Sequence, residues 1–231
     1  MFTLSPEEQQ IIGLSLKVAA TATLFSLPPG VALAYLLSRY SFPGKALLSG
    51  LTHLPLILPP VVTGYALLLL FGRSGPLGRL LEPMGIVFAF DWTGAALAAA
   101  VMGFPLLVRA VRLSFDMVDP RIESAAGTLG AGPIVRFLTI TLPLALPGVA
   151  AGTVLAFAKA LGEFGATITF VASIPGETRT LPLAIYSLTQ LPDGEAALLR
   201  LILISVGVSI GALVLSEWGA RSVARRVGGV R

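Results

Sequence analysis

Three ionisable side chains that fall within or near the apolar runs of the chain could do chemistry there: Lys17, Lys159 and Glu163. Lys159 and Glu163 have the i, i+4 spacing at which opposite charges meet on one face of a helix. A charge at the centre of a membrane-spanning helix costs about 2.5–3.5 kcal/mol on insertion scales, so these side chains must face protein or water. We interpret the pair either as an internal ion pair that locks a helix or, together with Lys17, as the access region for a dianion.

Residues for metal, thiol or nucleotide chemistry are missing from the sequence. It has no cysteine, and we interpret its one histidine, His53, as a packing or capping residue rather than a proton relay. A G-x-x-x-x-G-K-[ST] motif is absent, and the GEFG stretch at 162–165 lacks the lysine that would contact a phosphate. We predict that the chain is not an enzyme, binds no metal or cofactor, and depends on a separate polypeptide for any use of ATP.

The elements that must position these residues are long apolar helices. Hydrophobic residues make up 55% of the chain and charged residues 12%, about half the charged share of a soluble domain, and the mean hydropathy is +0.88. Five apolar runs are each long enough to cross a bilayer and must be helical there, because lipid offers no hydrogen-bond partner to an open backbone. The runs are 11–37, 47–71, 93–113, 144–171 and 198–219. The polar start of the chain has no basic segment or cleavage site, so we expect the first run to be kept as a span.

Lysine and arginine are distributed unequally between the two sides of these runs. One side carries ten basic residues and the other carries four, and the richer side is expected to be cytoplasmic. The ten are Arg39, Lys45, Arg109, Arg112, Arg121, Arg136, Arg221, Arg225, Arg226 and Arg231, and the four are Arg73, Arg79, Arg179 and Arg200. With five spans, the N-terminus then lies outside and the C-terminus in the cytoplasm. The net charge of +4 reflects this bias and does not indicate nucleic-acid binding.

Prolines in four of the runs are expected to kink or interrupt the helices; they are Pro28, Pro29, Pro55, Pro59, Pro60, Pro105 and Pro147. The freed carbonyl groups are tolerated in a membrane where neighbouring helices or water satisfy them. Each proline taken singly can be explained as a packing kink in an ordinary helical bundle. Proline in four of the runs together favours a transport pathway. Hydroxyl and small residues on these helices are its candidate lining, although such hydroxyls often bond to their own helix. With the ionisable pair, the candidates are Thr63, Gly64, Thr153, Lys159, Glu163, Thr167 and Thr169.

A polar segment between the third and fourth runs, residues 116–143, has the character of a helical elbow in water. Gly130, Gly132 and Pro133 predict two short helices with a break between them. Small residues at 124–127 permit close approach to a partner, and Gly130 allows a sharp turn. We predict that the elbow is a cytoplasmic handle for another protein; the alternative is an amphipathic loop on lipid headgroups. A further short helix is expected within 177–190, at the outer face.

The elbow resembles the cytoplasmic loop of permease subunits of bacterial binding-protein-dependent ABC importers. That loop reads Glu-Ala-Ala, three residues, glycine, nine residues, isoleucine, one residue and Leu-Pro, and this chain matches it except that Ser124 stands at the glutamate position, directly after Glu123. The stretch LAFAKALGEFGATITFVASIPGETRTLPLAIY at 155–186 resembles molybdate permeases in particular, and the likeness extends from about residue 14 to residue 218. The resemblance implies that the elbow contacts an ATPase through Glu123, Ser124, Ala125, Ala126, Gly130, Ile140, Leu142 and Pro143.

The resemblance also implies an architecture and a set of partners. The fold would be an all-α integral membrane protein, with five transmembrane helices in the type I ABC importer (MetI-like) core and with cytoplasmic coupling helices. Residues 1–231 would form a single ABC transporter transmembrane domain, with the coupling-helix loop at 116–143. Two copies in the lipid of the bacterial inner membrane would form the pathway for molybdate, between cytoplasmic ATPase subunits and a periplasmic molybdate-binding protein.

Other functions are weighed against this one. A permease for sulfate, thiosulfate or tungstate is the nearest alternative, because those permeases share the GEFGAT and IPGET stretches in looser form. An ion-coupled secondary transporter would call for buried carboxylates or histidines near the midplane and for inverted repeats, which the sequence does not show. An enzyme within the membrane would need a clustered nucleophile and base or metal ligands, and the sequence offers none.

Overall fold

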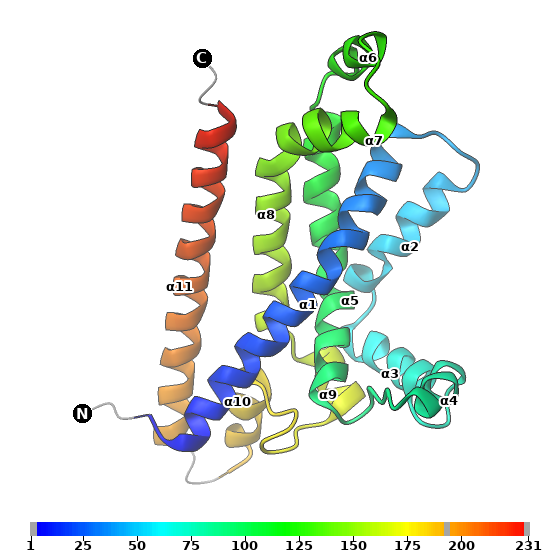
Figure 1. Cartoon of the computed structure of the whole chain (residues 1–231). Helices are drawn as coiled ribbons and strands as arrows, with labels where there is room; N and C mark the ends of the chain where they lie inside the picture. Colours follow the sequence, from blue (N-terminus) through cyan, green and yellow to red (C-terminus); the bar gives the residue numbers. More distant parts are fainter. Residues whose placement is uncertain (1–3, 192–194, 229–231) are drawn as a thin grey trace.

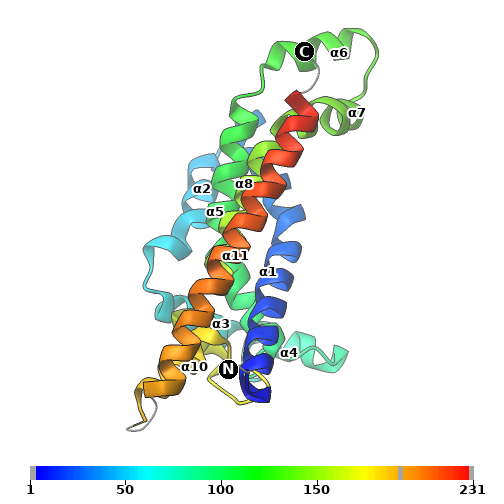
Figure 2. The same ribbon diagram turned by 90° about the vertical axis from the view of Figure 1, so that its left-hand side faces the viewer.

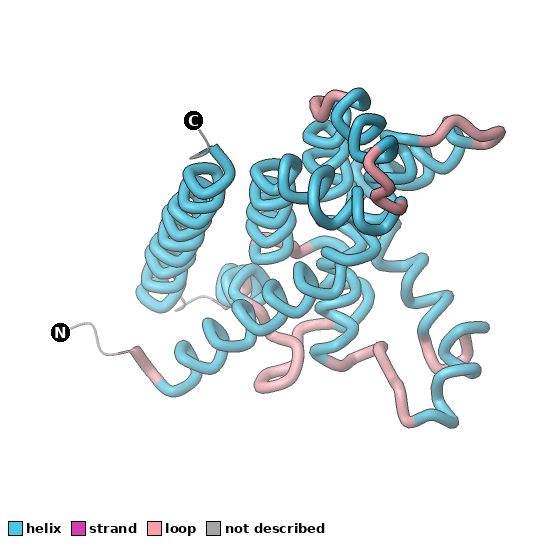
Figure 3. The backbone as a smooth tube through the Cα atoms, turned by 45° about the horizontal axis from the view of Figure 1, so that its top comes forward, coloured by secondary structure: helices cyan, strands magenta, loops and turns pink. Residues whose placement is uncertain are grey.

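The computed structural model describes residues 4–191 and 195–228, and these ranges form helices and connecting loops without a strand (Figure 3). Long helices make up the body of the bundle, and short helices lie at both of its ends (Figure 1). The α-helices are α1 (Pro6–Arg39), α2 (Lys45–Ile57), α3 (Pro60–Phe71), α4 (Pro76–Leu81), α5 (Trp92–Asp116), α6 (Pro120–Thr128), α7 (Pro133–Arg136), α8 (Leu142–Leu161), α9 (Gly165–Val171), α10 (Leu181–Thr189) and α11 (Glu195–Gly228). The predicted all-α class is confirmed.

Helix α5 lies at the centre of the bundle because small residues let α1 and α8 approach it closely. In its most apolar stretch 61% of the residues are buried, against 6% in the peripheral α11. Gly103 of α5 faces Ala156 of α8, and Gly152 of α8 faces Leu107 of α5. Close packing of this kind drives helix association in membranes, where lipid is as apolar as the side chains.

The interruption predicted at Pro28 and Pro29 is wrong. Helix α1 continues through both prolines and runs unbroken from Pro6 to Arg39. Gly30 follows them, and a β-carbon there would come within 2.6 Å of a methyl group of Leu107 in α5. α1 therefore packs tightly against α5 directly after the two prolines. The 34 residues of α1 span about 50 Å at 1.5 Å per residue.

The second predicted span, 47–71, is a bent pair of helices, which confirms the interruption predicted at Pro59 and Pro60, whereas α2 continues through Pro55. α2 ends at Ile57, α3 begins at Pro60, and the two are bent by 113°. Leu58 and Pro59 between them have extended backbone, with ψ of 145° and 133°. A residue that precedes proline avoids the helical region, and Pro59 and Pro60 both lack the N–H that would continue the helix. The described chain thus has four helices long and apolar enough to cross a membrane, or five if the bent pair is one span.

The fourth predicted span, 144–171, is likewise divided. α8 ends at Leu161, and after residues 162–164 the chain resumes as α9 at Gly165. A β-carbon at Gly165 would come within 2.7 Å of Pro60, the first residue of α3. The break in the second run, which Pro59 and Pro60 predicted, and the break in the fourth run, which was not predicted, therefore meet at one place in the fold.

The two ends of the bundle carry different short helices (Figures 1 and 2). The elbow helices α6 and α7 lie at one end, and α4, α9 and α10 lie at the other. α10 confirms the short helix predicted within 177–190. Leu181 and Ala184 of α10 are buried in one cluster with Ile11 of α1 and Leu201 of α11, so α10 packs between the starts of the first and last long helices.

Ion pairs at the two ends agree with the predicted division of basic residues. Arg39 pairs with Glu123 at the elbow end. At the opposite end Arg179 pairs with Glu7, and Arg200 pairs with Glu8. Residues assigned to different sides from the sequence thus lie at different ends of the bundle; Arg231 lies outside the described residues.

Candidate functional site

The elbow consists of two short helices, as predicted for 116–143. Asp119 caps the first of them, α6, by accepting a hydrogen bond from the backbone N–H of Arg121 at 2.9 Å. Gly130 then turns the chain with a φ of +87°, a left-handed conformation that favours glycine. After α7, a π-helical turn at Phe137–Thr141 leads directly into α8. The elbow is therefore joined to the bundle by continuous helix on its C-terminal side.

The residues predicted to meet a partner form an outer group and a basal group. Ser124, Ala125 and Gly130 are exposed, whereas Ala126, Ile140, Leu142 and Pro143 are half-buried. Two apolar side chains that were not predicted, Leu129 and Ile134, are 88% and 74% exposed. We call these two residues the elbow tip. Two large apolar side chains are thus exposed on this projecting segment.

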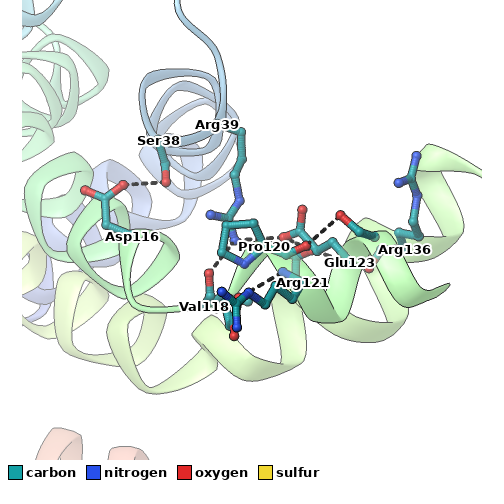
Figure 4. A network of polar contacts seen from close by, with 11 residues as sticks. Ser38, Arg39, Asp116, Val118, Pro120, Arg121, Glu123 and Arg136 are labelled. Carbon is teal, nitrogen blue, oxygen red and sulfur yellow. Dashed lines mark hydrogen bonds and ion pairs between the residues drawn. The ribbon is translucent and has the colours of Figure 1, made fainter. Parts of the chain in front are cut away.

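Glu123 differs from the other elbow residues because its carboxylate turns into the fold (Figure 4). Its Oε1 accepts hydrogen bonds from Nη2 of Arg39 and from Oγ1 of Thr141, each at 2.8 Å. Nη2 of Arg39 also donates to the carbonyl oxygen of Val118 at 3.1 Å. The side chains of Arg39 and Glu123 are only 13% and 16% exposed. Glu123 thus joins α6 to the end of α1 and to the start of α8.

Neighbouring contacts strengthen this link between α1 and the elbow. Ser38 donates to the carboxylate of Asp116 at 2.5 Å, where α5 ends. The ring of Tyr35 lies edge-on against Phe115 and Phe137, with centroids 5.5 and 4.8 Å away. Arg39, Ser38 and Thr141 are not among the sequence-predicted site residues. The sequence signal that could have identified Arg39 was its place: it is a basic residue at the end of the first run, on the same predicted side of the membrane as Glu123.

Lys159 and Glu163 form the predicted ion pair, with Nζ and Oε2 2.5 Å apart. Glu163 lies beyond the end of α8, in the break before α9, so the pair closes a helix break rather than lying along one helix. Its other oxygen, Oε1, accepts the backbone N–H of Ala166 in the first turn of α9 at 3.0 Å. The Glu163 side chain is 1% exposed and that of Lys159 is 29% exposed. This geometry agrees with the first interpretation of the pair, an internal lock.

Four of the other predicted pathway residues come together where α3 and α9 pack. A β-carbon at Gly64 of α3 would come within 2.4 Å of the carbonyl oxygen of Ala166 in α9. Thr63 and Thr167 are buried, at 7% and 2% exposure. Thr169 is half-buried and bonds back to the carbonyl oxygen of Gly165 at 2.7 Å. Oγ1 of Thr63 is buried and has no hydrogen-bond partner among the described residues.

Thr153 is placed apart from this group. It faces an apolar cavity of about 730 Å³ between α1, α8 and α11, which Leu16, Phe157 and Val208 also line. Its hydroxyl bonds back to the carbonyl oxygen of Val149 at 2.7 Å. The structure therefore does not bring Thr153 together with Thr63, Gly64, Thr167 and Thr169, and its hydroxyl is already satisfied within α8.

Lys17 and His53, two further ionisable residues within the predicted spans, each have a contact that the structure shows. Nζ of Lys17 lies 3.4 Å from the centroid of the Trp92 ring, a cation–π contact between α1 and the start of α5. Nδ1 of His53 lies 2.7 Å from the carbonyl oxygen of Ser49, one turn earlier in α2. The contact of His53 agrees with the predicted packing role.

Comparison with known proteins places this geometry among transporter subunits. Residues 26–226 match the family described as "Binding-protein-dependent transport system inner membrane component". The chain is 58% identical to the molybdenum transport system permease protein ModB of Escherichia coli (strain K12), over 99% of this chain and all of the relative. It is 52% identical to the Haemophilus influenzae protein of the same description, over 96% of this chain and 97% of the relative. A sulfate transport system permease protein, CysW of Synechococcus elongatus, is 37% identical over 90% of this chain and 72% of its own length.

Solved structures with the same fold are also transporter components. A bacterial ABC transporter for alginate import superposes with a TM-score of 0.75 at 18% identity, covering 95% of this chain and 80% of the other. An inward-facing MetNI methionine ABC transporter superposes with a TM-score of 0.70 at 15% identity, covering 95% of this chain and 99% of the other. At these identities the likeness concerns the fold.

Proposed function

The chain belongs to the family of binding-protein-dependent transport system inner membrane components, and from this premise we propose that it is the membrane subunit of an ATP-driven molybdate importer. The observation that carries the proposal is identity of 58% over essentially the whole length of a molybdenum permease. Identity to a sulfate permease is 37%, which favours molybdate over sulfate; thiosulfate and tungstate stay as alternatives. The chain is a permease rather than an enzyme, and ATP hydrolysis belongs to a partner.

The coupling role is proposed for the elbow. A cytoplasmic ABC ATPase would dock on the elbow tip and on the small residues of α6, of which Ser124 and Ala125 are exposed and Ala126 is half-buried. Ile140, Leu142 and Pro143 would brace the elbow against the bundle, and Gly130 would set the angle between its helices. A short helix held in a partner's groove transmits that partner's motion as a rigid-body shift.

The membrane arrangement follows from charge and backbone chemistry. We propose five spans, with the bent pair α2–α3 as one of them, the N-terminus outside and the C-terminus in the cytoplasm of the bacterial inner membrane. The supporting observation is that basic residues predicted for opposite sides pair at opposite ends of the bundle. A periplasmic molybdate-binding protein would then dock at the end that carries α4 and α10.

A second copy of the chain is proposed on the side of the bent pair. The chain leaves helical geometry at Leu58 and Pro59, and Pro59 and Pro60 offer no N–H to the last carbonyl groups of α2, which lipid cannot satisfy within the hydrocarbon region. Protein or a water-filled pathway must therefore cover them. Thr63, Gly64, Thr167, Thr169, Lys159 and Glu163 gather at the same break and would border the pathway there. They offer no strong anion site, which suits a conduit because a tightly bound oxyanion would not leave.

Reconstitution tests the proposed function. The chain would be placed in proteoliposomes with its ATPase and a molybdate-binding protein, and uptake of labelled molybdate would be measured with and without ATP and in competition with sulfate and tungstate. We expect ATP-dependent uptake that excess sulfate does not suppress. Uptake by the chain alone would instead favour an ion-coupled transporter, and suppression by sulfate or tungstate would reassign the substrate.

A further inference from the structure

We propose that Arg39 is a positioning residue that couples the elbow to helix α1, so that Glu123 acts inside the permease rather than as a contact to the ATPase. The inference rests on the proposed function, because it concerns how motion of the elbow reaches the spans. It assigns a role to a residue 84 positions away from Glu123 in the sequence, outside the elbow motif.

The geometry places Arg39 at a junction of several elements (Figure 4). It is the last residue of α1, and its Nη2 contacts both the carbonyl oxygen of Val118, before α6, and the carboxylate of Glu123, within α6. The same carboxylate oxygen receives Oγ1 of Thr141, which is fully buried where the elbow joins α8. One oxygen atom of Glu123 thus holds donors from α1 and from the base of α8.

Because it is largely buried, the ion pair between Arg39 and Glu123 is expected to hold its elements together more strongly than a surface ion pair would. Exposed pairs contribute little because water screens them, whereas the side chains of Arg39 and Glu123 are at most 16% exposed. Removal of one partner would leave a largely buried charge uncompensated. Ser38 adds a second contact beside the first by donating to Asp116 at the end of α5. A displacement of α6 must therefore move the last turn of α1.

Helix α1 can carry that displacement to the other end of the bundle, because it is unbroken from Pro6 to Arg39. At its far end the buried Glu8 contacts Nε of Arg200 in α11 at 3.3 Å. Oγ of Ser15 accepts the backbone N–H of Leu181 in α10 at 2.7 Å. α1 is thus fixed to the elbow at one end and to α10 and α11 at the other, so a shift at one end can reach the other as a rigid-body movement of the helix.

The test compares Arg39→Gln with Arg112→Gln in the complete complex of permease, ATPase and molybdate-loaded binding protein. Both substitutions remove one positive charge near the elbow. Arg112, however, pairs with Asp116 at 3.8 Å within α5, so its ion pair joins no two elements, and Asp116 keeps its acceptor for Ser38. The measured quantities are copurification with the ATPase and the amount of molybdate taken up per ATP hydrolysed. The uptake per ATP hydrolysed reports coupling. A variant that merely assembles less well would lower uptake and hydrolysis together and would leave this ratio unchanged.

We expect Arg39→Gln to keep the ATPase bound and to lower uptake per ATP by about fivefold or more, the lower part of the usual range for coupling between sites. Arg112→Gln should stay near wild type, and the charge exchange Arg39→Glu with Glu123→Arg should recover part of the loss. Where Arg39→Gln does not assemble, Arg39→Lys is measured instead, because the ammonium group keeps the charge but lacks the planar guanidinium that places Nη2 between the Val118 carbonyl and the Glu123 carboxylate.

A wild-type ratio in the assembled Arg39→Gln or Arg39→Lys complex would overturn the inference, as would an equal loss in Arg112→Gln. Failure of the proposed function looks different, because the wild-type chain itself would then show no ATP-dependent molybdate uptake. If wild type couples and the Arg39 variant couples equally well, only the role of Arg39 fails.

Discussion

Gly64 of α3 and Ala166 of α9 lie so close that a β-carbon on Gly64 would come within 2.4 Å of the Ala166 carbonyl oxygen. Gly64 lies in the second turn of α3, after the break at 58–59, and Ala166 lies in the first turn of α9, after the break at 162–164. The pair therefore holds together two spans that are each divided, and the predicted pathway residues Thr63 and Thr167 are their immediate neighbours in the chain. Packing at this point decides where those hydroxyl groups lie.

Gly64→Ala is expected to destabilise the permease, because the new methyl group meets backbone that cannot rotate away. Overpacking of this kind typically costs about 1–3 kcal/mol. Thermal melting in detergent would measure the change. Gly50→Ala is the matched control, since nothing lies within 4 Å of a β-carbon at Gly50 in α2; it should be neutral or stabilising. Equal melting temperatures for the two variants would contradict the close packing.

Glu163→Gln should weaken the lock between α8 and α9. The amide keeps an acceptor for the N–H of Ala166 but removes the charge that faces Lys159. Because Lys159 is partly exposed, we expect a loss near the lower end of the about 1.5–3 kcal/mol that a hydrogen bond to a charged group contributes. Melting of Glu163→Gln, Lys159→Met and the double variant would give the coupling between the two positions. If the stability losses of the two single variants simply add up in the double variant, the interaction between Lys159 and Glu163 does not contribute to stability.

Gly130→Ala should disturb the elbow through backbone conformation rather than through crowding. Nothing lies within 4 Å of a β-carbon there, but the φ of +87° is left-handed and costs other residues about 1–2 kcal/mol. We expect weaker copurification with the ATPase. Gly132→Ala is the matched control, because Gly132 is equally open and has a φ of −66°. If both variants bind the ATPase as wild type does, the turn at Gly130 is not needed for docking.

Thr63→Val should leave the fold intact or stabilise it while lowering molybdate uptake. The buried hydroxyl of Thr63 has no partner among the described residues, and an unpaired buried hydroxyl costs about 1–3 kcal/mol by mutational data. Thr52→Val provides the comparison, since its hydroxyl already bonds to the carbonyl oxygen of Leu48 at 2.7 Å. Unchanged uptake in Thr63→Val would remove Thr63 from the pathway.

Labelling of single cysteines can determine the orientation of the bundle, because the chain has no cysteine of its own. Leu129 on the elbow is 88% exposed, and Met84 at the opposite end is 71% exposed. With intact spheroplasts and a membrane-impermeant maleimide, we expect Met84→Cys to react at once and Leu129→Cys to react only after permeabilisation. The reverse pattern would place the elbow outside and remove its role in ATPase docking.

Local features of the sequence were sufficient to predict the class of protein and the elbow. Membrane helices are recognised by runs of apolar residues, and the elbow by Gly130, Gly132 and Pro133, because these signals lie within short stretches of chain. The Ala125–Pro143 spacing and the 155–186 stretch likewise pointed to the family that comparison confirms. The short helix within 177–190 was found in the same way.

Tertiary structure decided what the proline pairs do and where Glu123 points. Pro28-Pro29 and Pro59-Pro60 are alike as local patterns, yet α1 continues through the first and the chain bends by 113° at the second. The difference lies in the neighbours: Gly30 fits tightly against Leu107, whereas Pro60 and Gly64 fit against the start of α9. Glu123 similarly needed a partner 84 residues away to turn its carboxylate inward. Such contacts join distant parts of the chain, and only the folded bundle brings them within reach.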